Sequence, residues 1–212
     1  TQQYPYLAII NIGRYGVTAA DKATTLKLQS VNVSKMNATL YKFDTETYIR
    51  TLGFSYDAWR TFKPSGDPIK AWTLVTSAKI DQYVTQDLGL DALPAGFYFL
   101  TVTSAEGVND TQVLIATKSA LTMKRTQDQV LVWATNLMDG TPINKLLLTF
   151  FNAKGERVGT GATDQDVAVF NQSLVIRGCG HGNTSGPRLF VANCEADAFR
   201  KVFVGQLDGK VI

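Results

Sequence analysis

The sequence predicts an all-β protein built from two consecutive immunoglobulin-like antiparallel β-sandwich domains. Short runs of β-branched and aromatic residues recur along the chain between Gly, Pro, Asn and Asp, which is typical of sandwiches. Helical patterns are scarce. A Leu-Pro-Ala-Gly turn at 93–96 leads into a strand that starts with Phe97 and Tyr98. This arrangement predicts a tyrosine corner, in which the Tyr98 hydroxyl bonds to the backbone upstream.

In the first half, we expect strands at 7–12, 25–28, 36–43, 72–78, 96–104 and 110–117. The last two alternate in polarity and are joined by a loop of turn-forming residues, which predicts an antiparallel pair. One short helix is expected at 45–52, because Asp44 can cap its first turn and Tyr48 and Leu52 fall on one face.

In the second half, we expect strands at 121–125, 129–136, 145–152, 158–162, 167–172, 188–193 and 200–205. This half has hairpin turns of its own, which favours two domains, 1–117 and 119–212. The first domain carries an irregular insertion near 52–70. Trp133 lies in an alternating strand, so we expect it to be buried.

The charge of the chain argues against two classes of partner. Lys and Arg number 21 against 18 Asp and Glu, and the basic residues are scattered. No nucleic-acid partner is therefore expected. The longest apolar runs are far shorter than the roughly 20 residues that span a bilayer. Membrane attachment is expected only through an anchor outside these residues.

Both cysteines and the single histidine lie in one glycine-rich stretch, 177–194. If this stretch is extended, Cys179, His181 and Asn183 project from one face, as a nucleophile, a base and an orienting group would. Cysteine enzymes usually draw these groups from different elements in a deep cleft, however. We therefore expect that the protein is not an enzyme.

The same stretch offers few ligands for a metal. Cys179, His181 and Cys194 are the soft or imidazole candidates, and a fourth ligand could come from Glu195 or Asp197. This spacing matches no familiar zinc signature. No metal and no other cofactor is expected.

A structural disulfide between Cys179 and Cys194 is the interpretation that the sequence favours. The strands that flank the loop bring the two residues within bridging distance, and closing the loop stabilises the fold by roughly 3 kcal/mol. Two unpaired thiols in a reducing compartment remain the alternative. A bridge would indicate a protein that works outside the cytoplasm.

A partner contact is expected in the insertion, at Trp59 and Tyr56. Loops on rigid sandwiches often carry binding residues, and Trp59 is the tryptophan that we expect to be most exposed.

Several short motifs occur in a fixed order along the chain: Asn32-Val33, Leu40-Tyr41 with Asp44, the turn from Leu93 to Tyr98, Val130 to Trp133, Asn136-Leu137, Gly140 and Pro142. In this order they resemble the amino-terminal arm of bacterial alpha-2-macroglobulin-like proteins. The resemblance covers most of the chain and is weakest at 173–212. It departs from the family pattern at Val167, where a glycine is expected.

The resemblance implies two consecutive macroglobulin-type domains, each a seven-stranded sandwich, from a large peptidase trap. That protein would be periplasmic, anchored in the cell envelope or secreted. Its partners would be other domains of the same chain, and peptidases would be its targets. The family's thioester forms in a Cys-x-Glu-Gln motif, which neither cysteine matches, and no bait region can be assigned.

We therefore expect a non-catalytic scaffold fragment of an endopeptidase inhibitor. The alternative function is a tandem immunoglobulin-like module for surface adhesion or ligand binding.

Overall fold

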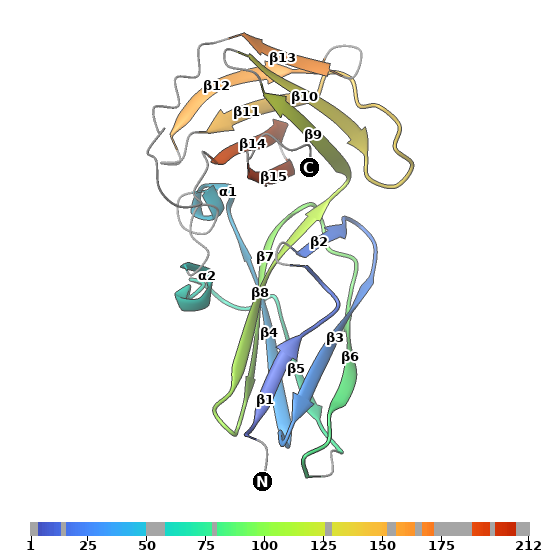
Figure 1. Ribbon diagram of the computed structural model, residues 1–212, viewed down its shortest axis with the longest axis vertical. Coiled ribbons are helices and arrows are strands. Elements are labelled where there is room, and N and C mark those ends of the chain that lie inside the picture. Colours follow the sequence, from blue (N-terminus) through green and yellow to red (C-terminus); the bar gives the residue numbers. More distant parts are fainter. Residues whose placement is uncertain are drawn as a thin grey trace. The chain divides into compact units, whose positions relative to one another are not determined.

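The computed structural model describes residues 4–13, 16–49, 58–77, 80–125, 129–151, 156–163, 167–171, 188–195 and 198–206. The regular structure in these ranges is mostly β-strand in antiparallel sheets, which confirms the predicted all-β class (Figure 1). No helix in the described ranges is long and apolar enough to cross a membrane.

The chain divides into two compact units, Thr1–Asp44 with Asp57–Ala116 and Thr45–Tyr56 with Thr117–Ile212. The predicted ranges 1–117 and 119–212 are continuous and differ from these units at 45–56 and at 117–118. The assignment of each range to one macroglobulin domain stays a prediction.

The first unit is a sandwich of a three-stranded and a five-stranded sheet, ordered β1-β3-β6 and β2-β8-β7-β4-β5. Its described strands are β1 (Tyr6–Ile9), β2 (Gly16–Ala19), β3 (Thr24–Val31), β4 (Lys35–Phe43), β5 (Lys70–Val75), β6 (Val84–Leu90), β7 (Gly96–Ser104) and β8 (Asn109–Thr117). These are eight strands, one more than the resemblance implies.

The strands β2 and β6 were not predicted from the sequence. β2 has only four residues and approaches β8 so closely that a Cβ at Gly16 would lie 2.7 Å from the Val113 carbonyl oxygen. β6 pairs with β3 along its whole length, although Thr85, Gln86 and Asp87 interrupt its apolar residues. Both strands depend on a neighbour that lies far away in the sequence.

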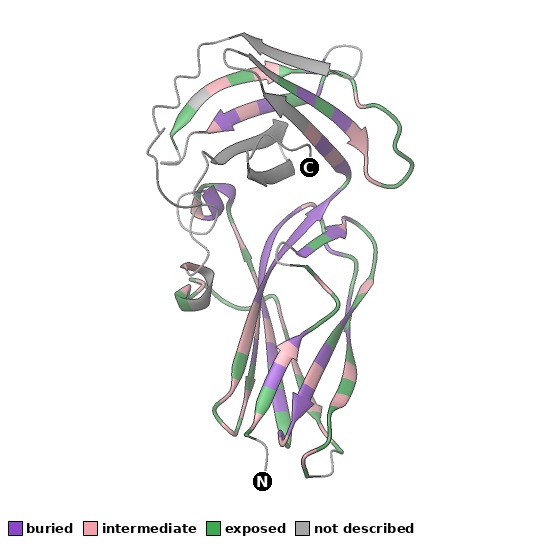
Figure 2. Ribbon diagram, in the orientation of Figure 1, coloured by how far each residue is buried: buried purple, intermediate pink, exposed green. Residues whose placement is uncertain are grey.

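The core of the first unit lies between its two sheets. Buried and exposed residues alternate along β3 and β4, as expected for strands with one face inward (Figure 2). The core includes Leu26, Leu28, Met36, Ala38, Leu40, Leu88, Leu90, Leu100, Val102 and Leu114. Full burial of each leucine stabilises the fold by about 1.5–3 kcal/mol.

The predicted tyrosine corner is confirmed. The Tyr98 hydroxyl donates to the Pro94 carbonyl over 2.8 Å, and the side chain is buried. The backbone amide of Asp21 donates to the carbonyl of the adjacent Leu93, also over 2.8 Å. Burial raises the pKa of Tyr98, and the Asp21 carboxylate raises it further. The corner therefore connects the 93–98 turn with the loop between β2 and β3.

The second unit also has two sheets, ordered β13-β10-β9 and β12-β11-β14-β15. Its strands are β9 (Ser119–Arg125), β10 (Gln129–Asn136), β11 (Leu147–Phe151), β12 (Arg157–Ala162), β13 (Val167–Asn171), β14 (Arg188–Glu195) and β15 (Ala198–Gln206). All seven strands predicted for this half are present. Val132, Ala134, Leu148 and Phe150 are among its most deeply buried described side chains.

Two short helices lie in the segment between β4 and β5: α1 (Thr45–Thr47) and α2 (Ala58–Thr61). α1 lies within the predicted helix 45–52 but is shorter, and residues 50–52 lie outside the described ranges. Tyr48, which directly follows α1, is buried.

Candidate interaction surfaces

The structure tests little of the predicted disulfide. Cys179 and His181 lie outside the described residues. Cys194 lies in β14 opposite Phe199 of β15, at an irregularity in the register, and its side chain is not described. The Cys179–Cys194 bridge stays a prediction. Within the described ranges, no three His, Cys, Asp or Glu residues gather as a metal site would require.

The predicted contact residues of the insertion are only partly described. Tyr56 lies outside the described ranges, and Trp59 lies on α2 without a described side chain. Their role as a partner contact stays a prediction. Phe62, three residues after Trp59, has described ring contacts with the first unit.

Phe62 packs on the face of the five-stranded sheet that lies opposite the core. Its ring meets Phe99 edge-on at a centroid distance of 5.1 Å and lies 5.9 Å from Phe43. Phe43 in turn lies 5.7 Å from Phe97. Phe97 and Phe99 are buried although they point away from the central core. The insertion therefore covers a second apolar layer of the first unit.

An exposed group of aromatic and aliphatic side chains lies where β1 and β6 begin. Tyr6 and Tyr83 meet edge-on with ring centroids 6.1 Å apart. Their exposed fractions are 42% and 60%, and those of Ile80 and Tyr4 are 75% and 91%. We call Tyr4, Tyr6, Ile80 and Tyr83 the Tyr6 surface. Such exposed apolar groups are typical of binding surfaces.

Hydrogen bonds fix the loops at this end of the unit. Asn32 and Asp81 are bonded reciprocally: the Asn32 amide donates to the Asp81 carboxylate and the Asp81 backbone amide donates to the Asn32 side chain, both over 2.8 Å. Both residues have a positive φ, 52° and 60°. The loop between β5 and β6 is thereby fastened to the turn between β3 and β4.

A carboxylate fastens the same turn from the other side. The backbone amide and hydroxyl of Ser34 donate to Glu106 over 2.7 and 2.6 Å. These bonds favour the ionised carboxylate and lower the pKa of Glu106 to about 2, with the Ser34 hydroxyl as the largest cause. Glu106 is therefore charged at any physiological pH.

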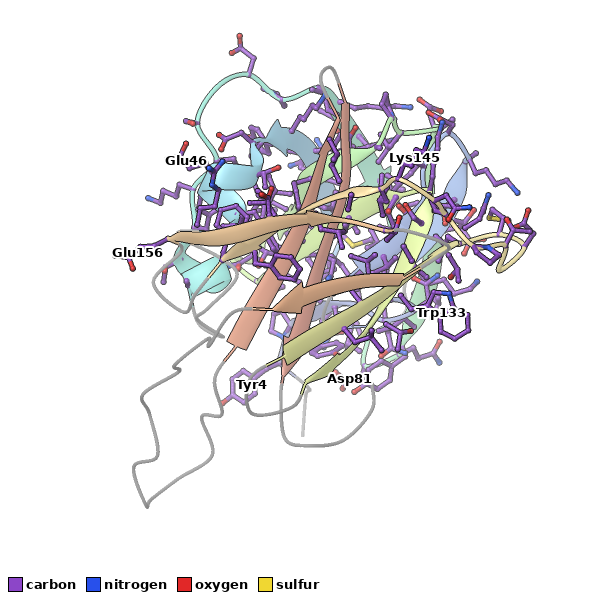
Figure 3. The ribbon with its side chains drawn as sticks, turned by 90° about the horizontal axis from the view of Figure 1, so that it is seen from above. Tyr4, Glu46, Asp81, Trp133, Lys145 and Glu156 are labelled. Carbon is purple, nitrogen blue, oxygen red and sulfur yellow. The ribbon has the colours of Figure 1, made fainter. Side chains whose placement is uncertain are left out.

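Another exposed aromatic residue lies in the second unit. Trp133 is 50% exposed, so the prediction that it is buried was wrong. The alternation along β10 turns Val132 and Ala134 inward and leaves Trp133 and Leu131 outward. The Trp133 indole extends away from the sheet (Figure 3). Its position in an alternating strand was clear from the sequence, but which face was inward was not.

The fold is shared with solved structures. Native alpha-2-macroglobulin from Escherichia coli, in a structure spanning domains MG0-NIE-MG1, matches 97% of this chain with a TM-score of 0.66 at 12% identity. The chain has the fold of these alpha-2-macroglobulin domains. This confirms the resemblance seen in the sequence motifs.

Two further alpha-2-macroglobulin structures match over the same extent. The E. coli structure spanning NIE-MG1 matches 96% of this chain with a TM-score of 0.61 at 11% identity, and 97% of it is covered. Salmonella alpha-2-macroglobulin reacted with methylamine matches 97% of the chain with a TM-score of 0.65 at 10% identity.

The chain spans 65% of the MG0-NIE-MG1 structure and 12% of the Salmonella chain. No family model and no curated protein matches its sequence. The likeness to alpha-2-macroglobulin is therefore one of fold. The sequence identities of 10–12% are too low for sequence comparison to detect it.

Proposed function

We propose that these residues form a non-catalytic structural part of an alpha-2-macroglobulin-like peptidase inhibitor. One observation supports this most strongly: 96% of the chain matches 97% of the NIE-MG1 structure. A match to one sandwich would be weak support, because sandwiches serve many functions. A match that includes both units and covers nearly all of both chains is much more specific than a match to one sandwich.

The first unit then corresponds to NIE and the second to MG1. The unmatched third of the longer E. coli structure corresponds to MG0, which precedes NIE in that protein, and we infer that a domain of this kind also precedes the pair here. The full protein is several times longer than 212 residues, as the 12% coverage of the Salmonella chain suggests. Such a trap works where foreign peptidases are met, in the periplasm, at the cell envelope or outside the cell.

The chemistry of these residues supports a scaffold role. Neither Cys179 nor Cys194 has the Cys-x-Glu-Gln context of a thioester. The described residues instead expose apolar side chains, among them the Tyr6 surface and Trp133, which suit contacts with other domains. The reactive parts of the inhibitor therefore lie elsewhere in the protein.

Peptidase protection by the full-length protein tests this function. A trap encloses its peptidase, so it shields the peptidase from large substrates but not from small ones. We expect the full-length protein to suppress digestion of a labelled protein substrate while hydrolysis of a small chromogenic peptide continues. The 212-residue chain alone serves as the control and should affect neither. Equal digestion of both substrates with and without the full-length protein would overturn the proposal.

The exposed Trp133 favours a second candidate, a ligand-binding or adhesion module, because a flat sheet face with an exposed indole can stack on a sugar or a peptide. Under this alternative the 212-residue chain binds a glycan or peptide by itself, and Trp133→Ser removes the binding. Failure of a glycan and peptide array to retain the chain would exclude this function.

A further inference from the structure

We propose that the Tyr6 surface is the docking site for the domain that precedes this pair in the same long chain. The proposal rests on the proposed function, because that function supplies the preceding domain. It goes further by assigning the contact to Tyr4, Tyr6, Ile80 and Tyr83.

The surface is formed by segments that meet at one end of the three-stranded sheet. Tyr6 begins β1 and is paired with Val31 at the end of β3. On the other side of β3, Ser30 is paired with Val84, which begins β6 directly after Tyr83. The edge-on contact of Tyr6 and Tyr83 therefore crosses the end of the sheet. The segments on the two sides of β3, β1 and the loop before β6, therefore both contribute to the Tyr6 surface.

These side chains do not serve the core of their own unit. The residues of β1 that enter the core are Leu7 and Ile9, whereas Tyr6 lies on the opposite face. Ile80 and Tyr83 lie on the loop before β6 and are mostly exposed. Large apolar groups gathered at the surface are favourable only when something covers them.

Hydrogen bonds hold the segments that carry the Tyr6 surface in place. The reciprocal Asn32–Asp81 bonds fix the loop that carries Ile80 and Tyr83. The Thr76 backbone amide donates to the Ser34 carbonyl over 3.0 Å, and Ser34 is itself bound by Glu106. A surface that is ordered before binding loses little conformational entropy when a partner docks.

The proposed function supplies an occupant that would be joined close to this surface. Tyr4 lies two residues before β1, so a domain joined there is tethered directly beside the patch. A short tether gives an effective concentration of about millimolar, at which even a small contact is occupied. A partner supplied by a separate molecule would need a much larger interface for the same occupancy.

Hydrogen exchange, measured by mass spectrometry on the full-length protein and on the 212-residue chain, tests the docking. The peptides that cover Tyr6–Ile9 and Ile80–Val84 should exchange at least about tenfold more slowly in the full-length protein, since each tenfold corresponds to about 1.4 kcal/mol of contact. Peptides of β2 should exchange alike in both proteins. Equal exchange of the Tyr6-surface peptides in the two proteins would overturn the proposal.

A pair of variants shows whether the side chains make the contact. In the full-length protein, Tyr6→Ser with Tyr83→Ser should restore fast exchange at Ile80–Val84. The matched control, Val17→Ser with Ile69→Ser, replaces two exposed apolar residues of the same unit and should leave exchange unchanged. Equal effects of both pairs would contradict the assignment.

Two other outcomes separate the competing explanations. Protection in the 212-residue chain that grows with its concentration would assign the surface to a second copy and overturn the proposal. Protection in a full-length protein that fails the peptidase assay would support the docking site and overturn the inhibitor function alone.

Discussion

The Tyr98 hydroxyl makes a single buried hydrogen bond that a conservative substitution can remove. Tyr98→Phe should lower the free energy of unfolding by about 1 kcal/mol, because the bond to Pro94 is lost while the ring still fills the core. Urea unfolding of the first unit measures this loss. The midpoint should fall, while the slope of the unfolding free energy against urea concentration stays the same. Tyr4→Phe, at an exposed position, is the control and should change the free energy by less than about 0.5 kcal/mol. Equal midpoints for the native chain and Tyr98→Phe would contradict the tyrosine corner.

Glu106 gives the first unit a dependence on acid pH. Its folded pKa of about 2 lies below the ordinary value of 4.5, so its contribution is complete above about pH 4.5 and is lost as the pH falls toward 2. Glu106→Gln should therefore lower the free energy of unfolding at neutral pH, and its difference from the native chain should narrow over that range. Unfolding free energies of the native chain and of Glu106→Gln, determined at a series of pH values, measure this difference.

Asp67→Asn is the control for Glu106→Gln, because Asp67 is an exposed carboxylate of the insertion. It should change the free energy little at any pH of the series. A Glu106→Gln difference that stays constant with pH would mean that the Ser34 bonds do not depend on the charge.

These two residues differ in how well the sequence predicts them. Tyr98 bonds to a carbonyl four residues away, so a local motif was enough. Glu106 bonds to Ser34, which is 72 positions distant, and only the pairing of β4 with β7 brings them together. Tyr6 and Tyr83 meet for the same kind of reason.

At the level of elements, the insertion acts as a cover for the five-stranded sheet. Phe62→Ala should lower the free energy of unfolding by about 2 kcal/mol, less than for a fully buried ring, because Phe62 is only half-buried against Phe43 and Phe99. It should also speed hydrogen exchange in β7. Ile69→Ala, in the same segment but exposed, should have almost no effect. Similar losses for both variants would show that Phe62 does not cover the sheet.

The 177–194 stretch carries the prediction of a disulfide. Under oxidising conditions, Cys179→Ser with Cys194→Ser should lower the melting temperature, in line with a loss of roughly 3 kcal/mol. Under reducing conditions the native chain and the variant should melt alike. A native chain that melts at one temperature in oxidising and reducing buffer would count against the bridge.

The sequence predicted a strand correctly where the strand has a recognisable residue pattern between turn residues. All seven strands of the second unit were predicted because turn residues separate them clearly. β2 and β6 were missed because they are defined by pairing with β8 and β3 rather than by their own composition. The burial of Trp133 was predicted wrongly for a related reason: alternation gives two faces, and packing decides which one is inward.

At the level of the whole molecule, the all-β fold was predicted from short β-branched and aromatic runs between turn residues, and the likeness to alpha-2-macroglobulin from short motifs in a fixed order. The structural matches confirm both at 10–12% identity. The Tyr6 surface could not be predicted, because it is formed by segments that are separate in the sequence. Its place in a longer protein follows from the proposed function.

The central claim is that these 212 residues support an inhibitor without reacting with its target. Peptide mapping by mass spectrometry, after the full-length protein has inhibited a peptidase, tests it directly. The peptides of residues 1–212 should be recovered intact, and every inhibitory cleavage and every covalent link to the peptidase should lie elsewhere in the chain. A cleavage or link within 1–212 that appears together with inhibition would contradict it.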